Sequence, residues 1–373
     1  MAKNGFRVMD SDLHVMEPGD LYERFLDSRF KHRAPVREWS QVAGVDKWVV
    51  DGHDVPLWAD WPEYHAANAR LIAKKANTPE QVRAHQRGFD AQSTLDAMDI
   101  EGIDIAVLYR TVAGIMSQGI DDLEPPFAAA LCRAYNRWIA DYCSLDTARL
   151  KGAAVIPLHD VDLAIAEARY AQELGLVAAC FYPEPVNGRM LYDTDTEPLW
   201  AALEDMGMPA AVHGTTTAPG REDFARKYLK HPAGRTFTQL MCFPVQLMPA
   251  VSGIILSGIL ERHPRLRVAF LEANCSWLPW LLYRMDHVQA NYTDTALSHP
   301  PSEYFKRQCF ISTDCDEELA ADVIARLGDD CLVISTDYPH SDSAFPHAMD
   351  EFFEVALPEA SRRKILWDNC ARF

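Results

Sequence analysis

Short apolar segments alternate with helical segments along most of the chain, and this alternation restricts the possible folds more than any other feature. Consecutive strand-then-helix units form parallel sheets, and eight of them in 373 residues predict an α/β fold of the (β/α)8 TIM-barrel type. A doubly wound open sheet is the alternative, but no Gly-x-Gly-x-x-Gly sequence follows any strand candidate. The strand candidates are residues 6–12, 103–108, 152–157, 176–182, 209–212, 266–271, 308–312 and 331–336.

One part of the chain departs from this pattern. Residues 30–88 lack a long helical period and are rich in Trp, Pro, His and charged residues, and the run from Trp48 to Val55 resembles a hairpin with an Asp-Gly turn. We therefore expect a single domain over residues 1–373, with a lid-like insertion after the first strand, at about 30–88, over the barrel mouth.

Composition narrows the class of partner. Hydrophobic residues make up 48% of the chain, which is ordinary for a globular enzyme, and the net charge is −18. Nucleic acids and anionic membranes attract clustered Lys and Arg, so a small-molecule substrate is expected instead. The N-terminus lacks the apolar run of a signal peptide, and no stretch looks long and apolar enough to span a membrane, which predicts a cytoplasmic protein. Nine cysteines without a Cys-x-x-Cys pair are interpreted as reduced core thiols.

Metal-ligand residue types stand at the ends of four strand candidates. Asp12 and His14 are two residues apart, so both side chains point to one side of an extended segment, which is a chelating arrangement. His213, Glu272 and Asp337 follow the fifth, sixth and eighth strand candidates. Because the active residues of such barrels lie at the C-terminal strand ends, these five side chains are expected to converge.

Three of these motifs carry a family resemblance. Asp12-Leu13-His14, the histidine in Ala-Ala-Val-His213-Gly and the aspartate in Ser-Thr-Asp337-Tyr-Pro-His resemble the amidohydrolase superfamily, in the branch related to aminocarboxymuconate-semialdehyde decarboxylase. The similarity extends to Leu-Glu-Arg-His-Pro at 260–264, Trp-Leu-Pro-Trp at 277–280 and Lys-Ile-Leu-Trp-Asp-Asn at 364–369. It covers most of the chain, and residues 30–88 match least well.

The resemblance implies a divalent metal ion at the barrel mouth, held by Asp12, His14, His213 and Asp337. Mixed imidazole and carboxylate ligands suit zinc, manganese or iron(II). One ion is expected and a second is conceivable. In this family the strand-eight aspartate also moves protons, so Asp337 would be both ligand and acid or base. Relatives often form dimers, which makes a homodimer possible.

One residue departs from the family pattern. The decarboxylases of this branch typically have a histidine at the end of the sixth strand, where this chain has Glu272. A carboxylate there removes a neutral hydrogen-bond donor and adds a negative charge with metal-binding oxygens. We therefore expect Glu272 to be a further metal ligand and a catalytic group together with His213 and Asp337, or otherwise to orient a ligand imidazole.

This departure shifts the expected reaction. The first expectation is a metal-dependent hydrolase that uses metal-activated water on an amide, ester, thioester or lactone carbonyl of a largely apolar or aromatic molecule. The alternative is a metal-dependent nonoxidative decarboxylase of an aromatic or unsaturated acid. The third hypothesis is a barrel that serves only as a binding scaffold. Such a protein would be expected to have lost its metal-ligating residues, and this chain retains them.

Further residues are candidates for contacting the substrate. Arg110 follows the second strand candidate and could hold a carboxylate, or form a salt bridge at the barrel rim. His340 and Tyr182 lie near strand ends, and Trp58 belongs to an aromatic group that either lines an apolar pocket or packs the insertion. Glu17 is either a solvated turn residue or a partner of the site.

Overall fold

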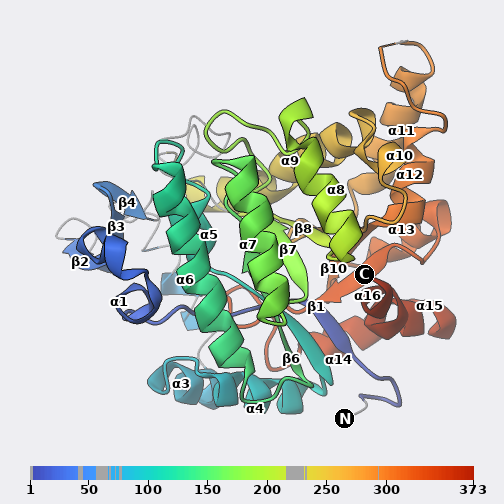
Figure 1. Cartoon of the computed structure of the whole chain (residues 1–373). Coiled ribbons are helices and arrows are strands. Elements are labelled where there is room, and N and C mark those ends of the chain that lie inside the picture. The colour runs from blue at the N-terminus through green and yellow to red at the C-terminus, as the bar shows by residue number, and fades with distance from the viewer. Residues whose placement is uncertain are drawn as a thin grey trace.

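A sheet of eight parallel strands forms the centre of the molecule (Figure 1). The computed structural model describes residues 3–40, 45–55, 66, 69–71, 73–74, 78–215, 231, 233–292 and 294–373. The strand order β1-β5-β6-β7-β8-β9-β10-β11 follows the chain, as a (β/α)8 barrel requires, so the predicted fold is confirmed. The strands are β1 (Met9–His14), β5 (Ile105–Tyr109), β6 (Leu150–Val155), β7 (Ala178–Phe181), β8 (Ala210–His213), β9 (Val268–Leu271), β10 (Cys309–Asp314) and β11 (Leu332–Ser335).

Hydrogen bonds between the first and last strands bring the barrel close to closure. The Ser11 hydroxyl donates to the carbonyl of Ile334 at 2.6 Å. At the rim the backbone N–H of Asp337 donates to the carbonyl of Asp12 at 3.2 Å, and that of His14 donates to the carbonyl of Tyr338 at 2.7 Å. These bonds place the exits of β1 and β11 next to each other.

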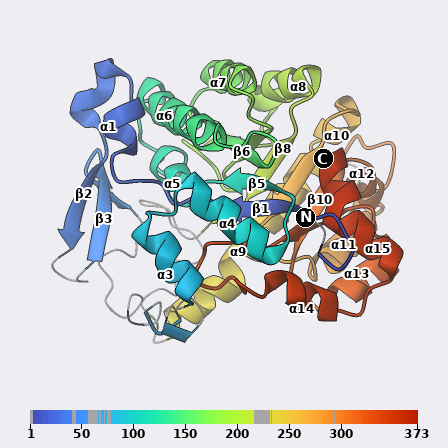
Figure 2. The ribbon, with the colours of Figure 1, turned by 90° about the horizontal axis from the view of Figure 1, so that it is seen from below.

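Helices surround the strands, as the view from below shows (Figure 2). Helical segments follow the strands, as the alternation in the sequence predicts. The helices of the ring are α4 (Ala91–Glu101), α6 (Pro125–Cys143), α7 (Val161–Glu173), α8 (Glu197–Met206), α9 (Gly234–Leu256), α10 (Ile259–Arg262), α11 (Leu278–Gln289), α12 (Pro301–Gln308), α13 (Ala320–Leu327), α14 (Ala348–Glu354), α15 (Glu359–Arg363) and α16 (Asn369–Arg372); a π-helical turn, Lys364–Asp368, links the last two.

The side chains along each strand belong alternately to two buried apolar clusters. One lies between strands and helices, and the other fills the barrel with side chains at alternate positions, as the period of two in a strand requires. Many of the interior residues are small, including Ala153, Ala178, Ala211 and Ala269. Cys370 of α16 packs against the same interior cluster. All nine cysteines are buried and none is in a disulfide, which confirms their interpretation as core thiols.

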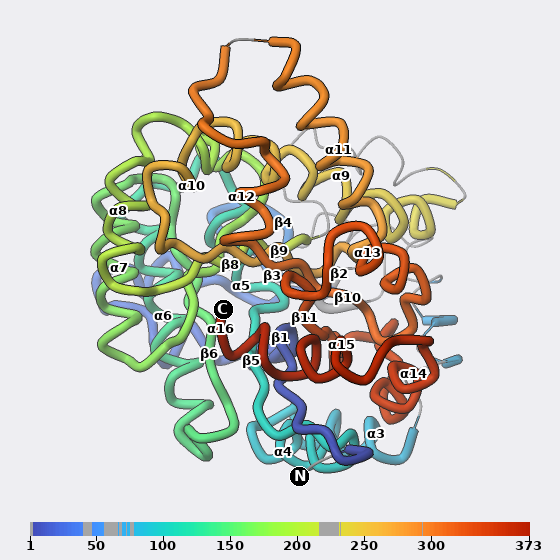
Figure 3. The backbone as a smooth tube through the Cα atoms, turned by 90° about the vertical axis from the view of Figure 1, so that its right-hand side faces the viewer, coloured from blue at the N-terminus to red at the C-terminus, as the bar shows by residue number. Residues whose placement is uncertain are grey.

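The apolar region after β8 forms two helices. α9 and α10 are separated at Gly258, whose φ of 79° is left-handed. The 23-residue α9 is also long and apolar enough to span a membrane by length and composition, so the expectation that no stretch qualifies is wrong. α9 packs against α10, α12 and β8 of the barrel. Of its most apolar 18-residue stretch, 44% is buried, so this stretch lies partly against the rest of the molecule. Figure 3 shows α9 beside α11.

The described part of the insertion forms a small antiparallel sheet at one side of the barrel (Figure 1). Asp51 and Gly52 both have positive φ, 46° and 85°, which confirms the predicted hairpin turn. The adjacent α1 packs against α6 of the barrel. That the insertion acts as a lid stays a prediction. The elements between β1 and α4 are α1 (Leu21–Phe25), a 3-10 turn (Ser28–Arg33), β2 (Val36–Ser40), β3 (Val45–Val50), β4 (His53–Val55) and α3 (Pro79–Gln86).

Asn136 of α6 fixes the end of β6 and provides a test of this architecture. Its fully buried amide donates to the carbonyl of Val155 at 3.0 Å and to Glu167 at 2.9 Å, and accepts the N–H of Val155 at 2.8 Å. Asn136→Ala would leave these buried groups unpaired, so we expect the free energy of unfolding, measured in urea, to fall by about 2–4 kcal/mol. The exposed control Asn291→Ala should change it by less than about 0.5 kcal/mol. Equal effects of the two variants would contradict this assignment.

Candidate metal centre

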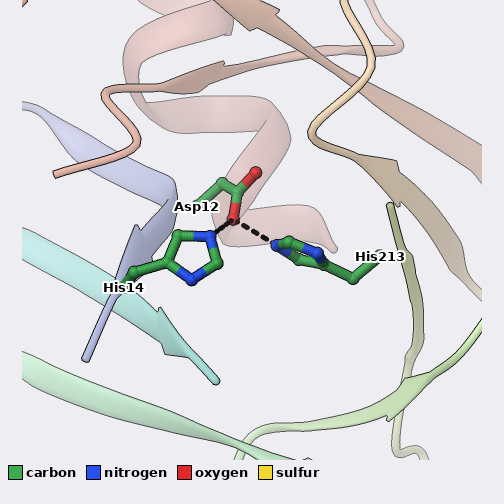
Figure 4. Close-up of side chains that lie close together, drawn as sticks. All are labelled: Asp12, His14 and His213. Atoms are coloured by element: carbon green, nitrogen blue, oxygen red, sulfur yellow. Dashed lines mark hydrogen bonds and ion pairs between the residues drawn. The ribbon is translucent and has the colours of Figure 1, made fainter. Parts of the chain in front are cut away.

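Three predicted ligands meet at the rim of the barrel. Asp12 and His14 come from β1 and His213 from β8, and all three side chains are essentially inaccessible to solvent. Figure 4 shows both imidazoles directed at the Asp12 carboxylate. Asp12 Oδ1 lies 3.0 Å from His213 Nε2 and 3.6 Å from His14 Nε2. Donor atoms that share an ion at about 2.0–2.2 Å are separated by roughly these distances, so the three residues could hold one metal ion.

Backbone contacts fix which nitrogen of each imidazole faces the site. A carbonyl oxygen can only accept, so the Nδ1–H of His14 donates to Arg110 O at 3.0 Å, and the Nδ1–H of His213 donates to Gly214 O at 2.7 Å. Each Nε2 therefore presents its lone pair to the site. His14 Nε2 is buried and has no hydrogen-bond partner in the described part of the chain, which suits a site for a cation. Burial lowers the pKa of both histidines, which keeps them in the neutral, ligating form.

Two carboxylates complete the arrangement. Asp337 Oδ1 lies 3.5 Å and Glu272 Oε2 3.6 Å from His14 Nε2. Glu272 Oε2 also lies 3.2 Å from His213 Nδ1, so its position suits either predicted role, metal ligand or orienting partner. Both residues have left-handed φ values, 59° for Glu272 and 56° for Asp337, a conformation that is uncommon outside glycine and that clusters at functional sites.

Burial also shapes the proton affinity of the acidic groups. It raises the pKa of Glu272 well above its usual range, and the charges of Asp337 and Asp12 raise it further. Burial raises the pKa of Asp337 to about 6, against the lowering effect of His340. Burial would lower the pKa of His340, but the charge of Asp337, whose Oδ1 is 2.6 Å from His340 Nδ1, outweighs it and raises that pKa to about 9. The contact with Asp337 thus favours the protonated form of His340.

His340 belongs to a second possible ligand group. His14, Asp337 and His340 also bring their ligand atoms close together, and this group shares His14 with the first one. His340 thus lies beside the candidate ligands, and its predicted contact with the substrate stays a prediction. Because the two groups overlap, they describe one shared neighbourhood rather than two separate metal sites.

Arg110 is almost fully buried beside these groups, with 2% of its surface exposed. Its Nη2 donates to the carbonyl of His213 at 3.3 Å, its Nη1 lies 3.2 Å from His213 Nδ1, and its Nε has no partner. Within the described residues no carboxylate forms an ion pair with it, so the predicted rim salt bridge is absent. A buried guanidinium without a carboxylate partner suits the prediction that Arg110 holds a carboxylate of the substrate, which stays a prediction.

Glycine and glutamate keep Arg110 in place. Gly114, in α5 (Ala113–Ser117), touches the arginine so closely that a Cβ at this position would lie 2.1 Å from Arg110 Nε. The Glu17 carboxylate accepts the backbone N–H groups of Thr111, Val112 and Ala113 at 3.0–3.2 Å. Of the two predicted alternatives for Glu17, the partner of the site is thus the observed one.

Some residues that support the site were not predicted. Asp10 is fully buried below Asp12, accepts the N–H of Asp12 at 3.0 Å and the Thr336 hydroxyl, and has its pKa raised by burial to about 7. Glu317 accepts N–H groups of Cys275 and Ser276 and so fixes the loop after Glu272. The alternation Asp10, Asp12, His14 was a usable signal for the first residue, whereas nothing in the sequence marks Glu317.

The cavity at this rim has two lobes. The arginine lobe, about 220 Å³, is lined by His14, Arg110, Val112, Ile115, Arg235 and His340 among others. The acidic lobe, about 260 Å³, is lined by Asp314, Asp316, Asp337, Ser343 and Glu351 among others. Gln239, Phe243, Glu272 and Asp342 line both.

Two predicted substrate contacts are not placed at these lobes. Tyr182 is buried at the end of β7 and is not among the residues that line either lobe, because its ring packs in the apolar layer outside the strands. Trp58 lies outside the described residues. Arg110 and His340 both line the arginine lobe, as expected.

Imidazole and carboxylate groups that converge on one rim of a (β/α)8 barrel define a class of proteins whose strand ends can hold a metal ion. A family model described as amidohydrolase matches residues 10–373, and the chain belongs to this family. The expected resemblance is confirmed. The γ-resorcylate decarboxylase of Rhizobium sp. (strain MTP-10005) is 28% identical over 77% of this chain and 88% of its own. The 2-amino-3-carboxymuconate-6-semialdehyde decarboxylase of Dictyostelium discoideum is 26% identical over 67% of both chains.

Solved structures share the fold. An amidohydrolase from Mycobacterium avium subsp. paratuberculosis K-10 superposes with a TM-score of 0.76 at 20% identity and 99% coverage of both chains. A dihydroxybenzoic acid decarboxylase from Polaromonas sp. JS666, with bound manganese and the inhibitor 2-nitroresorcinol, gives a TM-score of 0.66 at 19% identity, covering 98% of this chain and 95% of its own.

Metal analysis tests the candidate centre. After incubation with manganese and desalting, we expect about one ion per chain in the wild type. His213→Ala and Asp12→Ala should weaken the affinity by more than about 100-fold, because even outer partners of metal ligands are worth roughly 10- to 100-fold. The control His299→Ala, whose side chain is half exposed and remote in sequence from every candidate ligand, should bind like the wild type. Unchanged manganese content in both site variants would rule out this centre.

Proposed function

We propose that the protein is a manganese-dependent nonoxidative decarboxylase of a hydroxy-substituted aromatic acid. The observation that carries the proposal is Arg110, a buried cation beside the candidate metal ligands that lacks a carboxylate partner in the described part of the chain. Such a position suits the carboxylate that the reaction removes. The decarboxylases among the relatives, and the manganese bound by one structural neighbour, support the same reading.

This proposal replaces the first expectation from the sequence. Glu272 in place of a histidine favoured a hydrolase of amide, ester, thioester or lactone bonds, but the relatives named above are carboxy-lyases and none is a thioesterase. The 3.2 Å contact between Glu272 and His213 Nδ1 offers a reason why the substitution need not change the reaction. The carboxylate can orient the ligand imidazole without taking part in bond breaking.

The metal would be held by Asp12, His14, His213 and Asp337, with Glu272 as a further ligand or as the orienting partner. When bound, the ion supplies positive charge that orients the acid and stabilises negative charge on its oxygens. The guanidinium of Arg110 binds the substrate carboxylate, and the apolar side chains of Val112, Ile115 and Phe243 provide walls for the ring.

Decarboxylation breaks the bond between ring carbon and carboxylate, releases carbon dioxide and leaves an electron pair on the ring carbon. That carbon must gain a proton. Asp337 is placed at the metal centre to pass one on, and its neighbour His340, whose Nδ1 lies 2.6 Å from Asp337 Oδ1, can supply the proton. A proton enters from solvent for each carbon dioxide released, which balances the reaction.

Deuterium incorporation tests the reaction. Manganese-loaded protein incubated in D2O with 2,6-dihydroxybenzoate and other hydroxybenzoates should release carbon dioxide, and mass spectrometry should find one deuterium on the ring carbon that lost it. Asp337→Asn should abolish turnover. If a parallel panel of thioesters and lactones is cleaved while no aromatic acid loses carbon dioxide, the protein is a hydrolase and the proposal fails.

Gly114 tests the role of Arg110 without altering a charged residue. In Gly114→Ala the new methyl group would displace the guanidinium, and we expect kcat/KM for the aromatic acid to fall about 100-fold, as misplacement of a binding group by 1 Å can cause. Circular dichroism should show an intact fold. In an Arg110→Met background the same change should have little further effect; a full additional 100-fold loss there would mean that Gly114 acts independently of Arg110.

A further inference from the structure

The two lobes of the cavity differ in charge. The arginine lobe contains Arg110 and Arg235, whereas every charged residue that lines the described part of the acidic lobe is acidic. Both lobes border Glu272, so a molecule anchored at the candidate metal centre extends naturally into either one. The cavity is therefore built for a molecule with different groups at its two ends.

Asp314 is one of the carboxylates that line the acidic lobe. It ends β10, and its Oδ2 accepts a hydrogen bond from the Asn274 side chain at 2.6 Å. In the described part of the chain no Lys, Arg or His forms an ion pair with it. Burial, followed by the neighbouring charges of Glu317 and Asp337, raises its pKa well above the usual range.

A second group in the lobe also awaits a partner. Ser343 is only 6% exposed, lines the acidic lobe, and its hydroxyl is buried without a hydrogen-bond partner among the described residues. A buried hydroxyl without a partner is costly, so a ligand that donates hydrogen bonds would stabilise it. Together, Asp314 and Ser343 offer acceptors for N–H groups.

A second metal ion is a poorer occupant of this lobe than an organic cation. The described groups of ligand atoms close enough to hold an ion are those at the candidate metal centre, and neither contains Asp314. An ammonium group has three N–H donors and does not require several ligands at short range.

We infer that the acidic lobe binds a positively charged amino group of the substrate, at the end of the molecule opposite its carboxylate. The placement of the carboxylate at Arg110 rests on the proposed function, whereas the binding of an ammonium at Asp314 and Ser343 does not. The substrate class is then an aromatic acid that also carries an aminoalkyl substituent.

Binding of two small probes tests the inference without any turnover. Benzylamine, which is protonated at pH 7, and benzyl alcohol, which is neutral and nearly the same shape, are titrated calorimetrically into manganese-loaded protein. Saturating the metal site beforehand keeps benzylamine from occupying it. We expect benzylamine to bind at least about 10-fold more tightly, because hydrogen bonds to charged groups contribute more than neutral ones.

Variants test whether the preference for benzylamine over benzyl alcohol arises at Asp314 and Ser343. Asp314→Asn should reduce it to about 3-fold or less, and Ser343→Ala should weaken benzylamine more than benzyl alcohol, because hydrogen bonds from a charged donor contribute more. Asp205→Asn, which removes the same charge from an exposed position, should leave the preference unchanged. Equal binding of the two probes to the wild type, or an equal loss in Asp314→Asn and Asp205→Asn, would overturn the inference. If benzylamine binds as expected while no aromatic acid is decarboxylated, the proposed function fails and the ammonium site stands.

Discussion

The contact between the first and last strands is the constraint on which the site depends. Asp12 and Asp337 are more than three hundred residues apart, yet one backbone hydrogen bond of 3.2 Å joins them across the closing seam. The Asp10 carboxylate lies beneath this seam and accepts hydrogen bonds from both strands, at Asp12 and Thr336. Without closure at this point the two acids would lie on opposite edges of an open sheet, and no common ion could reach them.

Much of the fold could be predicted because periodicity survives in the sequence. Strands buried on both faces read as continuous apolar runs, and their helices keep a period of 3.6 residues. The break between α9 and α10 has no such signal, because Gly258 sits inside an apolar stretch, where its left-handed conformation leaves hydropathy unchanged. By length and composition alone, α9 cannot be told from a membrane-spanning helix. Its packing against α10 and β8 is a property of the folded chain that the hydropathy of the sequence does not report.

The candidate site could be predicted only in part. Residues that follow strands were recoverable, since the barrel brings strand ends together, and Asp12, His14, His213, Glu272 and Asp337 do converge. Tyr182 also follows a strand, but β7 ends at Phe181, and beyond that residue the alternation of the strand no longer decides which side a side chain faces; Tyr182 belongs to the cluster between strands and helices. Contacts between distant loops, such as that of Glu17 with the N–H groups after Arg110, have no local signature.

The left-handed backbone at Asp337 separates the shape of the barrel from its chemistry. Asparagine adopts this conformation as readily as aspartate and fits the same volume, so an amide at position 337 costs the fold little. A β-branched residue there would instead strain the seam. In evolution, replacement of Asp337 by asparagine could thus remove the carboxylate while the barrel stays folded. A catalytically inactive relative would then be a single substitution away.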